Sequence, residues 1–202
     1  MLDPLARRLI DPPLNRMGAA LAARGVAANT VTIAGFAIGL AAPLALAFEA
    51  YLWALAAILL NRLADGLDGA VARVRGPSDV GGFLDIVLDF VFYAGVPLGF
   101  AFARPDFALP AAFLLASFMG TASSFLAFAV FAAKHGLNTG RGGGKALYYL
   151  GGLTEGTETI ACFVACCLFP ALFPYFAYGF GLLCWLTTVS RVLAGVRIFR
   201  NR

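Results

Sequence analysis

The feature that most constrains the fold is a series of long apolar runs. They lie at residues of about 30–48, 51–72, 81–103, 107–133, 152–172 and 175–196. Each run approximates the ~20 residues that a helix needs to cross ~30 Å of hydrocarbon. Only 13% of the chain is charged, whereas a soluble domain carries about a quarter. The sequence therefore predicts an all-α, polytopic membrane bundle of about six transmembrane helices.

The first 25 residues differ from these runs, because four arginines and three prolines interrupt their apolar residues. They lack the uninterrupted apolar core of a secretory signal. An amphipathic helix on the membrane surface is a better interpretation, with its arginines facing lipid headgroups. We expect a single domain over 1–202, with an interfacial segment at 1–25 and a transmembrane bundle at 26–202.

Basic residues are distributed unevenly among the connections between the runs. On one side of the membrane we expect Arg7, Arg8, Arg16, Arg24, Arg73, Arg75, Lys134, Arg141, Lys145, Arg197, Arg200 and Arg202. On the other side the sequence offers only Arg104, beside Asp106. The positive-inside rule then predicts cytoplasmic termini and a cytoplasmic 73–80 connection, most simply in a prokaryotic cytoplasmic membrane. The modest net charge of +4 suggests no nucleic-acid partner.

Four carboxylates interrupt the second and third runs, although one charge at a helix centre costs roughly 2.5–3.5 kcal/mol. Asp65 and Asp68 are three residues apart, and Asp85 and Asp89 are four apart, so each pair shares a helix face. The short connection predicts antiparallel neighbouring helices with both pairs at the same, cytoplasmic end. We expect the four side chains to converge on one pocket.

Four converging carboxylates would repel one another unless cations neutralise them. All-oxygen ligands favour Mg²⁺, Mn²⁺ or Ca²⁺, and two such ions are a recurring device for phosphoryl chemistry. Gly69 would let a ligand approach the backbone, and the guanidinium of Arg73 suits a phosphate. Two other interpretations stay open: an ion or proton pathway, and structural pairing with Arg62, three residues before Asp65.

The segment Asp65-x-x-Asp68-Gly69-x-x-Ala72-Arg73, continued by Gly81-x-x-x-Asp85-x-x-x-Asp89, resembles the complete signature of the CDP-alcohol phosphatidyltransferase family. The expected architecture is similar to that family's fold over essentially the whole chain. The resemblance implies transfer of a phosphatidyl group from CDP-diacylglycerol to an alcohol, with release of CMP. A CDP-choline or CDP-ethanolamine phosphotransferase acting on diacylglycerol is the alternative within the same signature.

The resemblance also implies residue roles, a homodimer, and two divalent cations, Mg²⁺ or Mn²⁺. The metal ligands would be Asp65, Asp68, Asp85 and Asp89, with Asp89 also the general base. Donor-binding residues would be Asn29, Thr32, Gly69, Arg73 and Ser78.

The acceptor is less constrained and is expected to be a small alcohol or a phosphorylated alcohol. Candidate acceptor residues are Lys134, Arg141, Lys145, Glu155, Glu158 and Arg191. Lys and Arg would suit a phosphorylated acceptor, although positive-inside residues occur in such loops for any substrate. Glu155 and Glu158 fit a helix N-terminus equally well.

Overall fold

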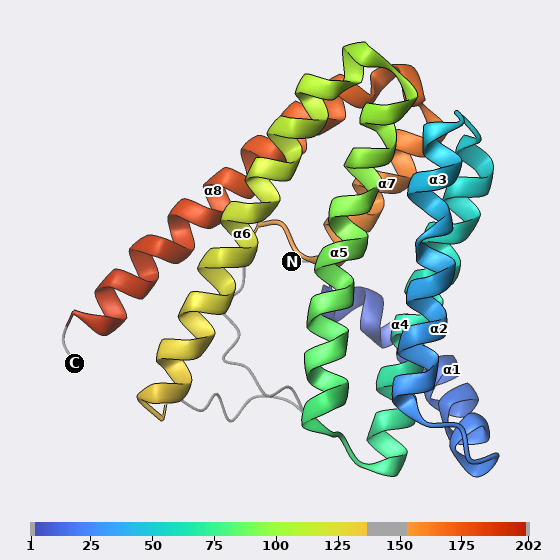
Figure 1. Ribbon diagram of the computed structural model, residues 1–202. Helices are drawn as coiled ribbons and strands as arrows, with labels where there is room; N and C mark the ends of the chain where they lie inside the picture. The colour runs from blue at the N-terminus through green and yellow to red at the C-terminus, as the bar shows by residue number, and fades with distance from the viewer. Residues whose placement is uncertain (1–2, 137–152, 201–202) are drawn as a thin grey trace.

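The computed structural model describes residues 3–136 and 153–200, and every regular element in these ranges is helical (Figure 1). The elements are α1 (Asp3–Ala23), α2 (Ala28–Gly39), α3 (Ala41–Ala47), α4 (Tyr51–Arg75), α5 (Asp79–Ala103), η1 (Pro105–Phe107), α6 (Ala108–Lys134), α7 (Gly156–Leu168), η2 (Pro170–Leu172) and α8 (Phe173–Phe199). The prediction of an all-α polytopic bundle is confirmed.

The described chain contains four helical segments that are long and apolar enough to cross a membrane. They are Ala28–Ala47, Asp79–Ala103, Pro105–Lys134 and Pro170–Phe199. Two of the six expected spans differ from these four. The helix α4 carries five charged residues from Arg62 onward, and α7 is only 13 residues long. The count of six is therefore not established by length and composition.

Prolines explain why two of the apolar runs break. The first run divides into α2 and α3 near Leu40, just before Pro43. Because proline has no N–H, it cannot continue the hydrogen bonding of α2 across that point. In the run at 152–172, Pro170 begins the short 3₁₀ segment η2, which separates α7 from α8.

The site region is organised around α2, which packs against both α4 and α5. The helices α4 and α5 run antiparallel through residues 76–78, as expected, and Gly76 turns the chain with φ of 95°. They are not packed closely along their length, however, because the α2–α3 pair fills the space beside them. Gly35 of α2 allows this by lying directly against Ala64 of α4.

The helix α1 lies across the bundle rather than along it, and it packs against α4 (Figure 1). Leu14 is buried against Gly66, and Gly18 lies against Ala70, so small residues bring the two helices close. This placement fits the expected surface helix, and it brings α1 beneath the acidic half of α4.

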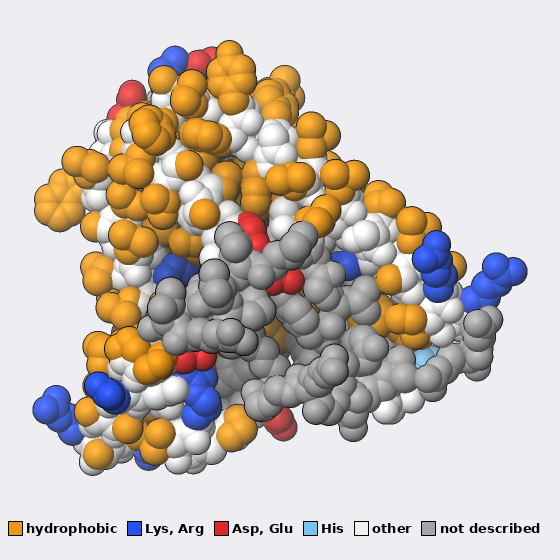
Figure 2. Space-filling view, turned by 180° about the vertical axis from the view of Figure 1, so that it is seen from behind, with side chains coloured by type: hydrophobic (Ala, Val, Ile, Leu, Met, Phe, Trp, Pro, Cys, Tyr) orange, Lys and Arg blue, Asp and Glu red, His pale blue; other side chains and the backbone are white. Residues whose placement is uncertain are grey.

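Hydrophobic side chains cover much of the described surface on the face that Figure 2 shows. Large exposed hydrophobic side chains include Phe48, Trp53, Phe102 and Leu109. The basic ends of α4, α6 and α8 lie toward the same end of the molecule, whereas the α5–α6 turn that carries Arg104 lies at the other (Figure 1). This is the distribution expected of a membrane protein that keeps its basic residues on one side.

Candidate metal centre and active site

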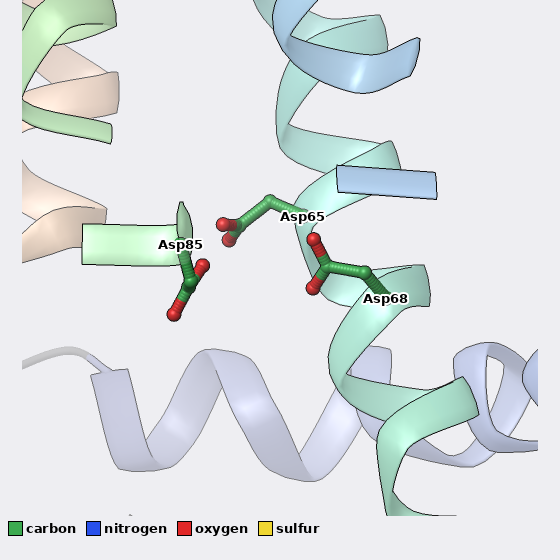
Figure 3. A group of neighbouring side chains, drawn as sticks. All are labelled: Asp65, Asp68 and Asp85. Atoms are coloured by element: carbon green, nitrogen blue, oxygen red, sulfur yellow. The ribbon is translucent and has the colours of Figure 1, made fainter. Parts of the chain in front are cut away.

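Three of the four predicted metal ligands meet between α4 and α5. Asp65 and Asp68 project from α4 and Asp85 from α5 (Figure 3). One carboxylate oxygen from each lies within 4.8 Å of the other two. Carboxylates this close are stabilised by a shared cation and destabilised without one. The convergence of these three side chains, predicted from the helix spacing, is present, and their role as metal ligands stays a prediction.

The three carboxylates differ in burial, and the burial of Asp68 favours a bound cation. Asp68 is buried, with 7% of its surface exposed, whereas Asp65 is half-buried and Asp85 is exposed. Oδ2 of Asp68 has no hydrogen-bond partner among the described residues. A buried carboxylate oxygen without a partner is costly unless a ligand completes it. The all-oxygen donor set suits Mg²⁺ or Mn²⁺.

Asp89 belongs to the same pocket but has a different immediate neighbour. Its Oδ1 accepts a hydrogen bond from the Arg62 guanidinium at 2.6 Å. Arg62 also lies 3.7 Å from Asp65, so the structural pairing considered from the sequence is present. The residues that line this pocket are Thr32, Gly35, Phe36, Asn61, Arg62, Asp65, Asp68, Asp85, Leu88 and Asp89.

The start of α5 places Asp85 and Asp89 in the pocket. Ser78 is the N-cap, and its hydroxyl accepts a hydrogen bond from the Gly81 N–H at 3.1 Å. Such caps satisfy backbone donors that a helix terminus leaves without partners. The cap thereby fixes where the helix begins and which face carries the two carboxylates.

The predicted donor-binding residues of α2 lie beside this helix start. A side-chain methyl added to Gly81 would come within 2.8 Å of Oδ1 of Asn29 and 3.1 Å of the Ser78 hydroxyl. Asn29, Ser78 and Gly81 are therefore close neighbours, although they are far apart in the sequence. Thr32 lines the acidic pocket one turn further along α2, and its hydroxyl donates to the Ala28 carbonyl.

Gly69 and Arg73 present a different situation on α4. A methyl group added to Gly69 would contact only the Arg73 guanidinium, at 3.5 Å, so the backbone there is open to a ligand. The Arg73 guanidinium donates two hydrogen bonds to Oδ1 of Asn15 on α1, at 2.7 and 3.2 Å. The helix α1 thus holds a predicted donor-binding residue in place.

The predicted acceptor residues are less closely grouped in the described structure. Lys134 is exposed at the end of α6, and Arg141 and Lys145 lie outside the described residues. Glu155 and Glu158 form a reciprocal capping box at the start of α7. Arg191 is buried on α8, where it donates to the Thr121 carbonyl at 3.2 Å.

Three neighbours of the site were not predicted from the sequence: Asn15, Asn61 and Tyr93. Asn61 precedes Asp65 by four residues and Asp68 by seven, so the helical stripe already contained a signal for it. Tyr93 follows Asp89 by four residues and could have been found in the same way. Asn15 had no comparable signal, because its role depends on how α1 docks on α4.

The four cysteines form no disulfide in the described structure. Cys166, Cys167 and Cys184 are buried in the apolar core, and Cys162 packs against it. They therefore serve as small apolar side chains in the helix packing.

The chain matches one protein family and several known proteins. Residues 25–193 match the family model described as CDP-alcohol phosphatidyltransferase. The chain is 55% identical over 196 residues to the inner membrane protein YnjF of Escherichia coli, covering 96% of this chain and 95% of that protein. It is 41% identical over 100 residues to the archaetidylinositol phosphate synthase of Pyrococcus horikoshii, covering 47% of this chain and 51% of that one.

A solved structure shares the fold at low sequence identity. It is the Mycobacterium tuberculosis phosphatidylinositol phosphate synthase PgsA1, with CDP-DAG bound. The TM-score is 0.74, with 17% identity, and the match covers 91% of this chain and 93% of that chain. The agreement therefore extends over nearly the whole bundle.

Proposed function

The chain belongs to the CDP-alcohol phosphatidyltransferase family, and we propose that it transfers a phosphatidyl group from CDP-diacylglycerol to an alcohol, releasing CMP. The observation that carries this proposal is the meeting of Asp65, Asp68 and Asp85 around one point between α4 and α5. The buried Oδ2 atom of Asp68 supports a cation there. The CDP-DAG in the related solved structure supports the choice of donor.

Asp65, Asp68, Asp85 and Asp89 would hold two divalent cations, Mg²⁺ or Mn²⁺. Bound cations would neutralise charge on the attacked diphosphate and on departing CMP. The donor set contains oxygen ligands only, which is the coordination that these hard ions prefer.

The protein's own groups would bind and orient the donor. Arg73 is suited to pairing with a diphosphate oxygen, and Gly69 leaves room for the nucleotide to approach the backbone. Asn29, Thr32 and Ser78 provide hydrogen-bonding groups around the start of α5. Gly69 and Arg73 belong to the family signature, whereas Asn29, Thr32 and Ser78 come from the wider family resemblance. All five are our assignment for the donor pocket.

Asp89 would act as the general base. The acceptor hydroxyl gives its proton to the carboxylate as its oxygen forms a bond to the phosphatidyl phosphorus. The bond between that phosphorus and the oxygen of CMP then breaks, and CMP leaves with the electron pair. An alcohol is a poor nucleophile at neutral pH, so a positioned base is needed.

We place the site at the cytoplasmic face of an inner membrane, because the basic ends of the helices gather at the same end as the acidic pocket. The diacyl tails of the donor require a bilayer, whereas CMP and a small alcohol require water. A site at the interface meets both demands. The printed name of the Escherichia coli relative agrees with this location. A homodimer remains a prediction from the family resemblance.

The acceptor is proposed to be a polyol or its phosphate ester. The names of two relatives, both inositol phosphate synthases, support this choice. Arg191 stays a candidate for binding a phosphate group. Lys134, Arg141 and Lys145 would supply further positive charge for a phosphate group. Glu155 and Glu158 are already used in capping α7, which favours a structural role for them.

The test uses purified protein in lipid nanodiscs with CDP-diacylglycerol, Mn²⁺ and a panel of free and phosphorylated alcohols. CMP release that requires the metal and one acceptor supports the proposal. CMP release from CDP-choline with diacylglycerol instead would support the alternative donor class. Failure of both donors with every acceptor, while the wild type is folded, would contradict it.

A further inference from the structure

Arg62 is a positive charge in the middle of α4 whose place in the site the family signature does not explain. Its side chain is only 15% exposed, and it lines the same pocket as the four aspartates. An arginine at a helix centre in a membrane is expensive, so its partners indicate its purpose.

The guanidinium of Arg62 is held by neutral groups on two helices. Nε and one terminal nitrogen donate to Oδ1 of Asn61, at 2.9 and 2.6 Å. The other terminal nitrogen donates to the Tyr93 hydroxyl at 3.1 Å. The guanidinium carbon lies 4.7 Å from the ring centre of Phe92 and 5.2 Å from that of Tyr93. These contacts fix the cation whether or not a carboxylate is nearby.

This fixed cation then engages the acidic pocket from one side. It donates to Oδ1 of Asp89 at 2.6 Å, and it lies 3.7 Å from Oδ2 of Asp65. A charge-assisted hydrogen bond of this kind is short and directional. Asp89, which the proposed mechanism uses as base, is therefore oriented through one oxygen by a group that does not itself react.

We propose that Arg62 is a positioning residue that orients the Asp89 carboxylate and keeps a permanent positive charge beside the cation site. The inference rests on the proposed function, since it assigns a role toward the same metal centre. Two consequences follow with opposite signs. A fixed positive charge repels a divalent cation, so Arg62 weakens metal binding. It also holds the base in place, so it raises turnover.

Because Arg62 is expected to weaken metal binding and to raise turnover, Mn²⁺ titration without substrate distinguishes this role from a structural one. We expect Arg62→Gln to bind Mn²⁺ about tenfold more tightly than the wild type, or more, by calorimetric titration in nanodiscs. The same variant should release CMP at least about tenfold more slowly. A merely structural role would weaken both binding and turnover. Unchanged or weaker Mn²⁺ binding in folded Arg62→Gln would overturn the proposal.

Two further variants complete the experiment. Arg62→Lys keeps the charge but loses the planar fork, so its Mn²⁺ affinity should stay within about threefold while turnover still falls. Wild-type turnover in Arg62→Lys would contradict the positioning role even if Arg62→Gln fails to fold. Arg104→Gln removes the same charge at the far end of α5, where the guanidinium pairs with Asp106, and should alter neither quantity.

Measurements on the wild type distinguish a failure of the proposed function from a failure of the role of Arg62. If it neither binds Mn²⁺ nor releases CMP, the proposed function itself fails. If the wild type does both, and Arg62→Gln matches it in affinity and turnover, only the role of Arg62 fails.

Discussion

At the scale of single residues, the acidic pocket joins carboxylates from two helices to one largely buried cation, because Arg62 of α4 donates to Oδ1 of Asp89 on α5. Because side chains three and four apart share a helix face, the spacing predicted that Asp65, Asp68 and Asp85 converge, and their carboxylates do. The same reasoning could not show that Asp89 is held by Arg62, since that contact depends on how α4 and α5 are set relative to each other. Tyr93 lies one turn after Asp89, so the spacing does place it on the same face, but its contact with Arg62 again depends on helix packing.

The first prediction concerns the base. Asp89→Asn keeps the size and the hydrogen-bonding capacity of the side chain but cannot accept the proton of the acceptor hydroxyl. We expect CMP release to fall by about 10²–10⁴-fold, the range for loss of general-base catalysis. The thermal unfolding midpoint should change little in comparison. Turnover near the wild-type rate would remove Asp89 from the role of base.

The second prediction concerns the contact between Asn15 and Arg73. Asn15→Ala removes the acceptor of two hydrogen bonds, so the guanidinium loses its orientation toward the predicted donor pocket. We expect a higher KM for CDP-diacylglycerol with a smaller change in kcat, measured by initial rates of CMP release. Asn138→Ala is not a suitable control, because that residue lies outside the described structure; Arg75→Gln on the exposed end of α4 is better. An unchanged KM in Asn15→Ala would show that Arg73 needs no such support.

At the scale of helices, the site depends on close packing of small residues. The sequence predicted a series of apolar helices, but it could not predict that α2 would pack against both α4 and α5. That arrangement follows from Gly35 lying against Ala64, a contact between residues 29 positions apart. The prediction that α4 and α5 are antiparallel neighbours did not include the packing of α2 beside both of them.

The third prediction tests this helix contact. Gly35→Ala forces α2 away from α4, because the added methyl group meets the Ala64 side chain. Overpacking of this kind destabilises by about 1–3 kcal/mol. Ala64→Gly in the same chain should recover part of the loss, as measured by reversible unfolding in detergent. Equal stability of wild type and Gly35→Ala would show that the contact can relax freely.

At the scale of the whole molecule, the apolar surface fits a bundle that spans a membrane, and the charge distribution fits basic helix ends on one side of it. The basic ends of α4, α6 and α8 lie toward one end of the bundle, and large apolar side chains cover much of its flank (Figure 2). Composition was sufficient to predict a polytopic helical protein. It could not establish six spans, because α4 carries the charges of the site and α7 is short.

The fourth prediction concerns this orientation. Single cysteines replacing Arg75 and Arg104, in a chain whose four native cysteines are changed to alanine, should be labelled from opposite sides of the membrane. In intact bacterial cells a membrane-impermeant maleimide should reach position 104 and fail to reach position 75. The reverse pattern would place the acidic pocket on the outer face.

The most direct measurement is anomalous diffraction from crystals of the full chain soaked in Mn²⁺. A cation site shared by Asp65, Asp68 and Asp85 predicts anomalous peaks within about 2.5 Å of their carboxylate oxygens, the distance expected for hard-cation coordination. It also predicts that the peak beside Asp68 disappears in Asp68→Asn. Fully ordered aspartates with no anomalous density between α4 and α5 at saturating Mn²⁺ would contradict the central claim.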